Sequence, residues 1–384
     1  RGQKMEKTIS GKDLTQDFDA SNMSKTDKKL MQIVESYKKR IRVIGVGGSG
    51  CNTLTRLSYL NIDESELIGM NTDVQSLLTT VADRKIILGP QACKGLGTGS
   101  NVSLGEDSVR ESMDNIISVL EGSSIVFMTS GLGGGTGSGS VPIIAETARS
   151  MRVVSVACVT LPFNSEGLQR WRNAEYALKK LQTIADTVIV IPNDKLLELA
   201  PNRSMNDAFQ MADNLLGDAL GGMIDLVTKP GLVNRDIADL RSILKDAGVA
   251  VMGVGESKNP DEEERMIEAA EFAMRSPLLD ADVSTADRVL INIAGNKDMK
   301  LDGVNTAIEY VMDRVQPGAD LFWGVQIDNS LDQGTTKLMV ITGGVKSLGD
   351  LPLIEKIRRA STLREKGKSF ITDVAEGSVG FSYY

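Results

Sequence analysis

The sequence predicts an α/β fold, in which a doubly wound, mostly parallel sheet is followed by a long central helix and a second, smaller αβ domain with a mixed sheet. From residue 41 onward, short apolar runs alternate with amphipathic stretches of helical spacing. Several of these runs are apolar throughout, which is typical of parallel strands that are covered on both faces. Between residues 208 and 227, apolar side chains keep helical spacing, which predicts one long, buried helix.

The apolar runs define the expected strands. In the first sheet they lie at 41–46, 67–70, 85–88, 125–128, 153–161 and 187–191. In the second domain the expected strands lie at 249–254, 288–293, 321–327 and 338–342, with helices near 262–274 and 304–315. Because strands and helices alternate in the first part of the chain, its strands are expected to run parallel.

Composition shifts divide the chain into five expected segments. The breaker Lys229-Pro230-Gly231 ends the long helix, and the region before residue 41 is polar except for one short helical pattern. The expected segments are an N-terminal arm and helix at 1–40, a first domain at 41–204, the central helix at 205–230, a C-terminal domain at 231–350 and a basic tail at 351–384.

The overall composition is that of an acidic globular chain. Of 384 residues, 41% are hydrophobic and 24% are charged, the net charge is −8, and histidine is absent. The missing histidine excludes Ser-His-Asp and Cys-His catalysis, and the negative charge argues against a partner that is nucleic acid. The three cysteines lie far apart, so we expect reduced thiols. With neither a long apolar run nor a signal-peptide pattern, we expect a soluble, cytoplasmic chain without a transmembrane segment.

Glycine is concentrated at 45–50, 95–101 and 131–139, each time after an expected strand. Such segments let the backbone approach a phosphate closely, and helices expected to begin near Cys51 and Val141 would add free N–H groups. Six glycines in nine residues at 131–139 are costly in backbone entropy, so we expect them to wrap a polyphosphate rather than to serve packing alone. Because neighbouring parallel strands end at one edge of a sheet, the three segments should converge on one crevice.

A single glycine segment would leave other interpretations open. Taken alone, 45–50 fits the dinucleotide-binding turn of an NAD-dependent oxidoreductase with a Rossmann fold, or a tight strand–helix turn without any ligand. The oxidoreductase needs one glycine fingerprint and a ribose-binding acid about 20 residues further on, and the two additional glycine segments do not fit it. The pattern GxxxxGK[ST] does not occur, which excludes a P-loop protein.

Several blocks of the sequence resemble the tubulin/FtsZ superfamily in their order and spacing. Residues 133–139 read GGGTGSG, which is similar to the signature loop of that family. The further blocks are IGVGGSG at 44–50, NTD at 71–73, KGLGTG at 94–99, PFN at 162–164, IPNDKL at 191–196 and NRDIAD at 234–239. Together they span about residues 41–342 and are most similar to prokaryotic FtsZ, archaeal forms included.

The resemblance implies that 41–204 is a GTP-binding domain, which holds GTP or GDP with a Mg²⁺ ion. It assigns three sets of residues to the ligand. Those near the phosphates and magnesium are Gly47, Gly48, Ser49, Asn71, Asp73, Gly97, Thr98, Gly99, Gly134, Gly135, Thr136 and Gly137. Glu166 and Arg170 are near the ribose, and Asn193, Phe209 and Asp213 are at the base. Chemistry supports Asp213, because a carboxylate accepts hydrogen bonds from N1–H and the exocyclic amine of guanine and finds no such pair on adenine.

Several of these residues also have a plainer interpretation. Phe209 fits the apolar stripe of the long helix and would then be core, and Asp213 would be a solvated helix residue. Glu166 and Arg170 lie at i and i+4, where a surface ion pair contributes only about 0.3–0.5 kcal/mol. The NTD block at 71–73 would be a turn or a helix cap.

The glycine segments themselves offer no group to polarise an attacking water. Asn234, Asp236 and Asp239 follow the long helix and should be remote from the γ-phosphate within one chain. The resemblance implies that their loop enters the nucleotide site of the next subunit, so that the active site is completed in trans and the chains stack head to tail into protofilaments. A helix cap with acidic first-turn residues is the plainer interpretation, and the two are compatible.

The resemblance therefore implies a self-assembling cytoskeletal GTPase that acts in cell division, at the division site. Its main partner is another copy of itself. A membrane-tethering adaptor bound to the C-terminal tail is a further expected partner, and a frayed, solvated tail is the alternative. A homologue that binds nucleotide without hydrolysing it is another alternative, and the intact pair Asp236 and Asp239 argues against it.

Overall fold

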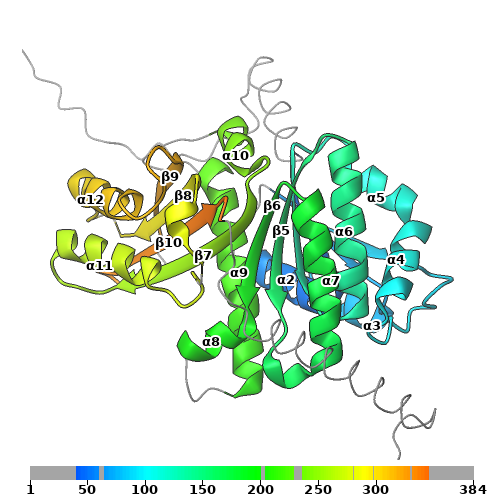
Figure 1. Ribbon diagram of the computed structural model, residues 1–384. Helices are drawn as coiled ribbons and strands as arrows, with labels where there is room; N and C mark the ends of the chain where they lie inside the picture. Colours follow the sequence, from blue (N-terminus) through cyan, green and yellow to red (C-terminus); the bar gives the residue numbers. More distant parts are fainter. Residues whose placement is uncertain are drawn as a thin grey trace, which may run out of the picture. The chain divides into compact units, whose positions relative to one another are not determined.

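The computed structural model describes residues 40–59, 65–199, 204–228, 236–279, 281–296, 298–328 and 331–345 (Figure 1). The expected N-terminal arm and helix, apart from Arg40, the expected basic tail and Asn234 lie outside these residues. Within the described ranges, no helix combines the length and the apolar character needed to cross a bilayer. Cys51, Cys93 and Cys158 are buried thiols, as predicted.

The strands of the described ranges form one continuous sheet. They are β1 (Ile41–Val46), β2 (Glu66–Asn71), β3 (Arg84–Ile87), β4 (Ile125–Gly131), β5 (Val154–Leu161), β6 (Thr187–Pro192), β7 (Gly248–Ser257), β8 (Arg288–Gly295), β9 (Asp320–Ile327) and β10 (Thr336–Gly343). Their order is β3-β2-β1-β4-β5-β6-β7-β10-β8-β9. Neighbours from β3 to β7 are parallel, β10 is antiparallel to β7 and β8, and β9 is parallel to β8. The predicted mostly parallel sheet and mixed sheet are both confirmed, and the short pairing of β6 with β7 joins them.

Helices cover both faces of the sheet. They are α2 (Gly47–Tyr59), α3 (Val74–Thr79), α4 (Val102–Glu111), α5 (Met113–Leu120), α6 (Gly135–Ser150), α7 (Leu168–Ile184), α8 (Asn193–Leu199), α9 (Met205–Thr228), α10 (Ile237–Leu244), α11 (Glu262–Met274) and α12 (Leu301–Met312). In β1, Ile41 and Val43 belong to the core shared with α2 and α9, whereas Ile44 and Val46 belong to the core that includes α6. Successive strand residues point to opposite faces, so a strand covered on both sides is apolar throughout.

The predicted long helix is α9, described over Met205–Thr228; residues 229 and 230 of the predicted helix lie outside the described ranges. Its buried Leu216, Leu220 and Met223 share one core with Leu54 of α2. The helix contacts α2 and β5 of the parallel part and β8 and β9 of the mixed part of the sheet (Figure 1). Its 24 residues span roughly 36 Å, at 1.5 Å per residue, so the helix runs from the carboxyl ends of the parallel strands to their amino ends.

Two helices begin earlier than the glycine content predicts. The expected starts near Cys51 and Val141 are wrong, because α2 begins at Gly47 and α6 at Gly135. The other predicted boundaries differ from the observed ones by three residues or fewer. The glycines that the sequence assigns to loops therefore form the first turns of both helices.

Close packing explains why α6 contains glycine. An added Cβ at Gly135 would lie 2.5 Å from the carbonyl oxygen of Asn101, and one at Gly139 would lie 2.5 Å from that of Val102. The backbones of α4 and α6 meet there, and this tertiary contact overrides the low helix propensity of glycine. Packing therefore requires glycine at both positions; Gly135 also lines the cavity described below, whereas Gly139 does not.

Candidate functional site

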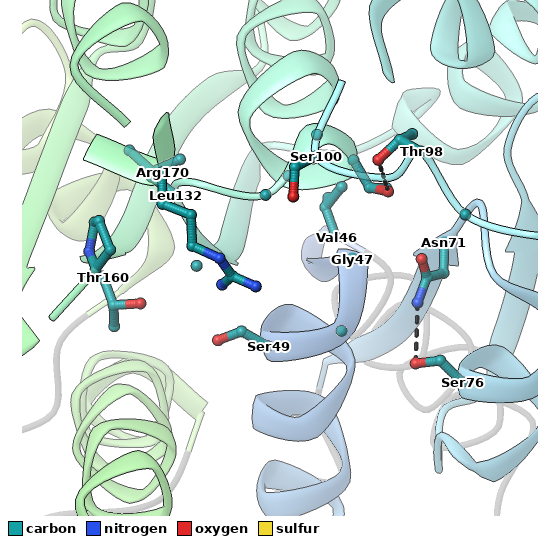
Figure 2. A pocket seen from close by; sticks show the side chains of 18 of the residues that line it. Val46, Gly47, Ser49, Asn71, Ser76, Thr98, Ser100, Leu132, Thr160 and Arg170 are labelled. Carbon is teal, nitrogen blue, oxygen red and sulfur yellow. Dashed lines mark hydrogen bonds between the residues drawn. The ribbon is translucent and has the colours of Figure 1, made fainter. Parts of the chain in front are cut away.

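A cavity of about 340 Å³ opens at the carboxyl ends of β1, β2, β4, β5 and β6 (Figure 2). The three glycine-rich segments converge on it, as the sequence predicts. Its wall includes every predicted nucleotide-binding residue except Gly99, which is exposed. The wall also includes residues that the sequence did not single out: Val46, Thr72, Ser76, Ser100, Gly131, Leu132, Thr160, Pro162 and Ala212. Most are chain neighbours of predicted residues, so a position at a strand end is the signal that could have identified them.

Both α2 and α6 begin at the wall of this cavity. Gly48 and Gly134 face its open space, because an added Cβ would meet no atom within 4 Å at either position. Neither helix carries an acidic side chain in its first turn. Free N–H groups and the positive end of the helix dipole favour an anion at such termini, so this pair of helices can hold phosphate groups.

Three threonine hydroxyls in the cavity wall link two of the glycine-rich segments to the chain that follows β2. The Oγ1 of Thr136 lies 2.7 Å from that of Thr72 and 3.3 Å from that of Thr98. All three residues are buried. Thr72 follows β2, Thr98 belongs to the 95–101 segment and Thr136 lies in the first turn of α6, so one hydrogen-bonded chain fixes their spacing.

Asn71 and Asp73 have local structural roles as well as a place in the wall. The Nδ2 of Asn71 donates to Ser76 Oγ at 3.0 Å (Figure 2). The Oδ1 of Asp73 accepts from the N–H groups of Gln75 at 2.8 Å and Ser76 at 3.3 Å, which makes Asp73 the N-cap of α3. The helix-cap interpretation is thus confirmed, and capping fixes the Asp73 carboxylate at the cavity.

Glu166 and Arg170 form the predicted ion pair on another part of the wall. The Nη1 of Arg170 lies 2.7 Å from Oε2 of Glu166, while Oε1 of Glu166 accepts from the Phe163 N–H at 2.8 Å. Arg170 is about half exposed, so the pair itself adds little stability. Its effect at the cavity is to hold a guanidinium group in a defined place.

Phe209 is not part of the core. It is 41% exposed, lines the cavity and contacts the buried Phe163 edge to face, with ring centroids 5.0 Å apart and an interplanar angle of 88°. The core interpretation of Phe209 is therefore wrong. The Phe209 ring, held in place by Phe163 and partly exposed at the cavity, can stack on a planar ligand.

Asp213 and Asn193 bring hydrogen-bond acceptors to the same end of the cavity. Burial raises the pKa of Asp213 from 3.8 to about 6, and hydrogen bonds from Ser49, Thr53 and Asn52 oppose the rise. The solvated-residue interpretation is therefore wrong. Asn193 is 5% exposed, and its Oδ1 has no hydrogen-bond partner. Buried acceptors without partners are costly, so this end of the cavity is built for a ligand that donates hydrogen bonds.

Asp236 and Asp239 lie away from the cavity wall. Asp236 caps α10, with its Oδ1 accepting from the Asp239 N–H at 2.8 Å, and both residues are exposed. The carbonyl of Leu244 in α10 accepts from the hydroxyl of Thr187, the first residue of β6. Hence α10 lies at the amino ends of the strands, and Figure 1 shows it at the opposite end of α9 from α8. The cap interpretation is confirmed, and one chain keeps these acids remote from its own cavity.

Comparisons with known proteins agree with this geometry. The family described as "Tubulin/FtsZ family, GTPase domain" matches residues 40–201, and "FtsZ family, C-terminal domain" matches residues 248–346. Cell division protein FtsZ 1 of Pyrococcus horikoshii is 49% identical, over 84% of this chain and 86% of its own. Cell division protein FtsZ of Methanothermobacter thermautotrophicus is 46% identical, over 85% of each chain. An empty FtsZ dimer from M. jannaschii is 40% identical with a TM-score of 0.78, over 84% of this chain and 93% of that one. The chain therefore belongs to the tubulin/FtsZ family of GTPases.

Proposed function

We propose that this GTPase binds GTP in the cavity, assembles head to tail with copies of itself and hydrolyses GTP where two subunits meet, as part of cell division. One observation carries the proposal: the phosphate cradle lies at the carboxyl ends of the strands, whereas Asp236 and Asp239 lie at the amino ends. Similarity to relatives named cell division proteins supports the biological role. The oxidoreductase alternative does not hold, because the chain belongs to a GTPase family.

The phosphates would lie between the N-termini of α2 and α6. Gly47, Gly48 and Ser49 would contact them from one helix, and the residues from Gly134 to Gly137 from the other. Open space at Gly48 and Gly134 supports this assignment, since a side chain there would occupy the volume of the ligand. Gly97 and Thr98 would approach the terminal phosphate from the third segment, whereas Gly99 would act only through the backbone shape of that segment.

The other end of the cavity suits a guanine base. Asp213 and Asn193 offer acceptors to N1–H and to the exocyclic amine, and Phe209 offers a ring for stacking. Adenine lacks an N1–H, so it would leave Asn193 Oδ1 unpartnered or the Asp213 carboxylate without a donor from the base, and an unmade hydrogen bond of this kind discriminates strongly between two bases. Glu166 and Arg170 would bind near the ribose.

A Mg²⁺ ion would be held largely by the nucleotide itself. In the part of the chain that the structure describes, His, Cys, Asp and Glu side chains form no group of three that suits a metal. The cavity offers one capping carboxylate, Asp73, together with the hydroxyls of Thr98 and Thr136. Mg²⁺ is commonly bound by one or two carboxylates plus phosphate oxygens and waters, so these residues fit it. The ion would neutralise phosphate charge during hydrolysis.

Asn234, Asp236 and Asp239 would act on the nucleotide of the neighbouring subunit. Asp236 and Asp239 are exposed, so their carboxylates are accessible to a second copy. A carboxylate near the γ-phosphate can orient and polarise the attacking water. A contact between unlike faces that does not close on itself produces a filament.

Two parallel measurements test the proposal. In binding titrations with GTP, GDP, ATP and NADH, we expect GTP to bind at least about a hundredfold more tightly than ATP. In hydrolysis assays, specific activity should rise above a threshold protein concentration that matches the onset of pelleting with GTP. Equal binding of GTP and ATP would refute guanine recognition, and a concentration-independent specific activity would refute hydrolysis at a subunit contact.

Further parts of the proposal rest on the resemblance. The tail at 351–384 would bind a membrane-tethering adaptor, and the protein would act in the cytoplasm at the division site. The domain boundaries at 41–204, 205–230 and 231–350 are likewise proposed, and the two matched family ranges support them. Limited proteolysis followed by mass spectrometry tests these boundaries, because cleavage should fall between the proposed domains.

A further inference from the structure

The side chain of Asn173, on α7, joins two glycine-rich segments from behind the cavity wall. Its Nδ2 donates to the carbonyl oxygen of Ser100 at 2.9 Å and to that of Gly133 at 3.0 Å. Asn173 is only 6% exposed and does not line the cavity itself. One buried side chain therefore fixes the distance between the end of the 95–101 segment and the start of α6.

The chemistry of this position requires an amide. Both partners are carbonyl oxygens, which only accept, so the central atom must carry two N–H groups. The Oδ1 of Asn173 accepts from Nε2 of Gln169, one turn earlier, at 3.1 Å, which fixes the orientation of the amide. Asparagine is a poor residue for the interior of a helix, so its presence here indicates a requirement outside α7.

Both anchored carbonyls belong to residues with a left-handed backbone. The φ of Ser100 is +64° and that of Gly133 is +115°. This region is unfavourable for serine, so the conformation of Ser100 depends on its surroundings. Gly133 has a second anchor, because its N–H donates to Ser138 Oγ at 2.8 Å. Loss of Asn173 would therefore affect Ser100 more than Gly133.

The 95–101 segment is held at several points. Thr98 Oγ1 lies 3.3 Å from Thr136 Oγ1, and Asn101 caps α4 by accepting from the Leu104 N–H at 3.2 Å. At its beginning, the N–H of Gly97 donates to the carbonyl of Thr72 at 3.2 Å. Beyond this point the chain is exposed at Gly99. Between these anchors, the bond from Asn173 to the Ser100 carbonyl ties the segment directly to α7.

We propose that Asn173 is a positioning residue for the terminal phosphate of GTP, acting through the 95–101 segment. The inference rests on the proposed function, in which Gly97 and Thr98 approach the γ-phosphate. A segment already held in shape loses less conformational freedom when the γ-phosphate binds, so GTP binds more tightly. GDP lacks that phosphate and gains little. Asn173 therefore increases the preference for GTP over GDP.

The variant Asn173→Asp tests this directly. It keeps the shape of the side chain but replaces both donors by a carboxylate oxygen that faces two carbonyls. Binding is measured with GDP and a non-hydrolysable GTP analogue, at protein concentrations below assembly. The dissociation constant for the GTP analogue should rise about tenfold, and that for GDP by less than about threefold. Asn173→Ser, which is too short to reach the carbonyls, serves if the aspartate variant does not fold.

Tyr176→Phe is the matched control on the same helix. The Tyr176 hydroxyl donates to Oε1 of Glu106 in α4 at 2.8 Å, so its loss also removes a bond between α7 and α4 without touching either segment. Both dissociation constants should stay within about twofold of the wild type. Equal losses for GDP and the GTP analogue in the Asn173 variants, or no change for either, would overturn the inference. Failure of the wild-type protein to prefer GTP over ATP would instead refute the proposed function.

Discussion

The hydroxyl oxygen of Ser49 lies 3.5 Å from Oδ1 of Asp213, so the first turn of α2 meets α9 at the cavity. This contact joins the two ends of the site, since Ser49 follows the phosphate-facing glycines and Asp213 belongs to the proposed base pocket. Asp213 is largely buried, and the hydroxyl and amide groups around it only partly replace water. An ionised carboxylate in such a place has a raised pKa, which leads to two predictions.

GTP affinity should depend on pH through Asp213. Its pKa of about 6 in the empty protein means that the carboxylate loses its charge as the pH falls below that value. Guanine donates to the ionised form, so affinity should fall by up to about tenfold per pH unit below pH 6. Titrations of GTP at pH 5, 6 and 7.5 measure this dependence. In Asp213→Asn the affinity should be lower and this pH dependence absent; the same dependence in the variant would assign it to another group.

The stability of the nucleotide-free protein should also depend on pH through Asp213, but in the opposite direction. Ligand binding needs the charged carboxylate, whereas folding favours the protonated one. Its folded-state pKa of about 6 lies above the ordinary value of 3.8, so the folded chain binds the proton more tightly than the unfolded chain. The free energy of unfolding therefore falls as the pH rises from about 4 to 6, and at pH 7 the full cost of holding the charged Asp213 carboxylate in the folded chain is reached.

That cost amounts to up to about 3 kcal/mol at pH 7, and Asp213→Asn should recover part of it. Urea unfolding without nucleotide, at pH 5 and at pH 7, measures the effect. The variant should gain free energy of unfolding over the wild type at pH 7 and about half as much at pH 5. A variant that is less stable than the wild type at pH 7 would contradict the account.

The hydroxyl chain in the cavity wall should be sensitive to Thr136→Val. The substitution conserves volume but leaves the buried hydroxyls of Thr72 and Thr98 without their shared partner, 2.7 Å and 3.3 Å away in the wild type. The free energy of unfolding should fall by about 1–3 kcal/mol. Thr147→Val in the same helix is the control, because Thr147 Oγ1 donates only within its own helix and to Met113, and its loss should cost less than about 1 kcal/mol. Similar losses of unfolding free energy in both variants would show that the hydroxyl chain stabilises the fold no more than an ordinary hydrogen bond within a helix.

Much of the fold could be predicted because parallel strands covered on both faces leave a continuous apolar pattern, as in β1 and β5. Helix starts could not be predicted from glycine content. Position 135 in α6 is glycine because the backbone of Asn101 passes too close for a side chain, and nothing in the local sequence reports that neighbour. Propensity is a weak guide wherever tertiary packing decides the backbone.

The candidate site was accessible to sequence analysis where residues follow strands and form motifs, as Asn71 and Asp73 do. Thr72 could have been identified as their neighbour. Asn173 could not, because its role depends on the carbonyls of Ser100 and Gly133, which are far from it in sequence. Hydrogen bonds from a side chain to a distant backbone leave no periodic or compositional pattern.

Asp239→Ala should separate assembly from hydrolysis. The residue is exposed and does not line the cavity of its own chain, so GTP binding and pelleting with GTP should be retained. Turnover per subunit should fall by about a hundredfold, the usual scale for losing a group that handles the proton of the attacking water. Phosphate release measured beside pelleting tests this, and turnover at the wild-type rate would remove Asp239 from the mechanism.

A mixing experiment tests the shared active site most directly. Gly134→Trp should block nucleotide binding without strain, because Gly134 has φ −75° and its Cβ direction points into open space. Alone, Gly134→Trp should not hydrolyse GTP, and Asp239→Ala should do so at only about a hundredth of the wild-type rate. When the two are mixed, the intact cavity of one subunit can meet the intact acids of the other, so phosphate release should clearly exceed the sum of the separate rates. A mixture whose rate merely equals that sum would contradict an active site built from two subunits.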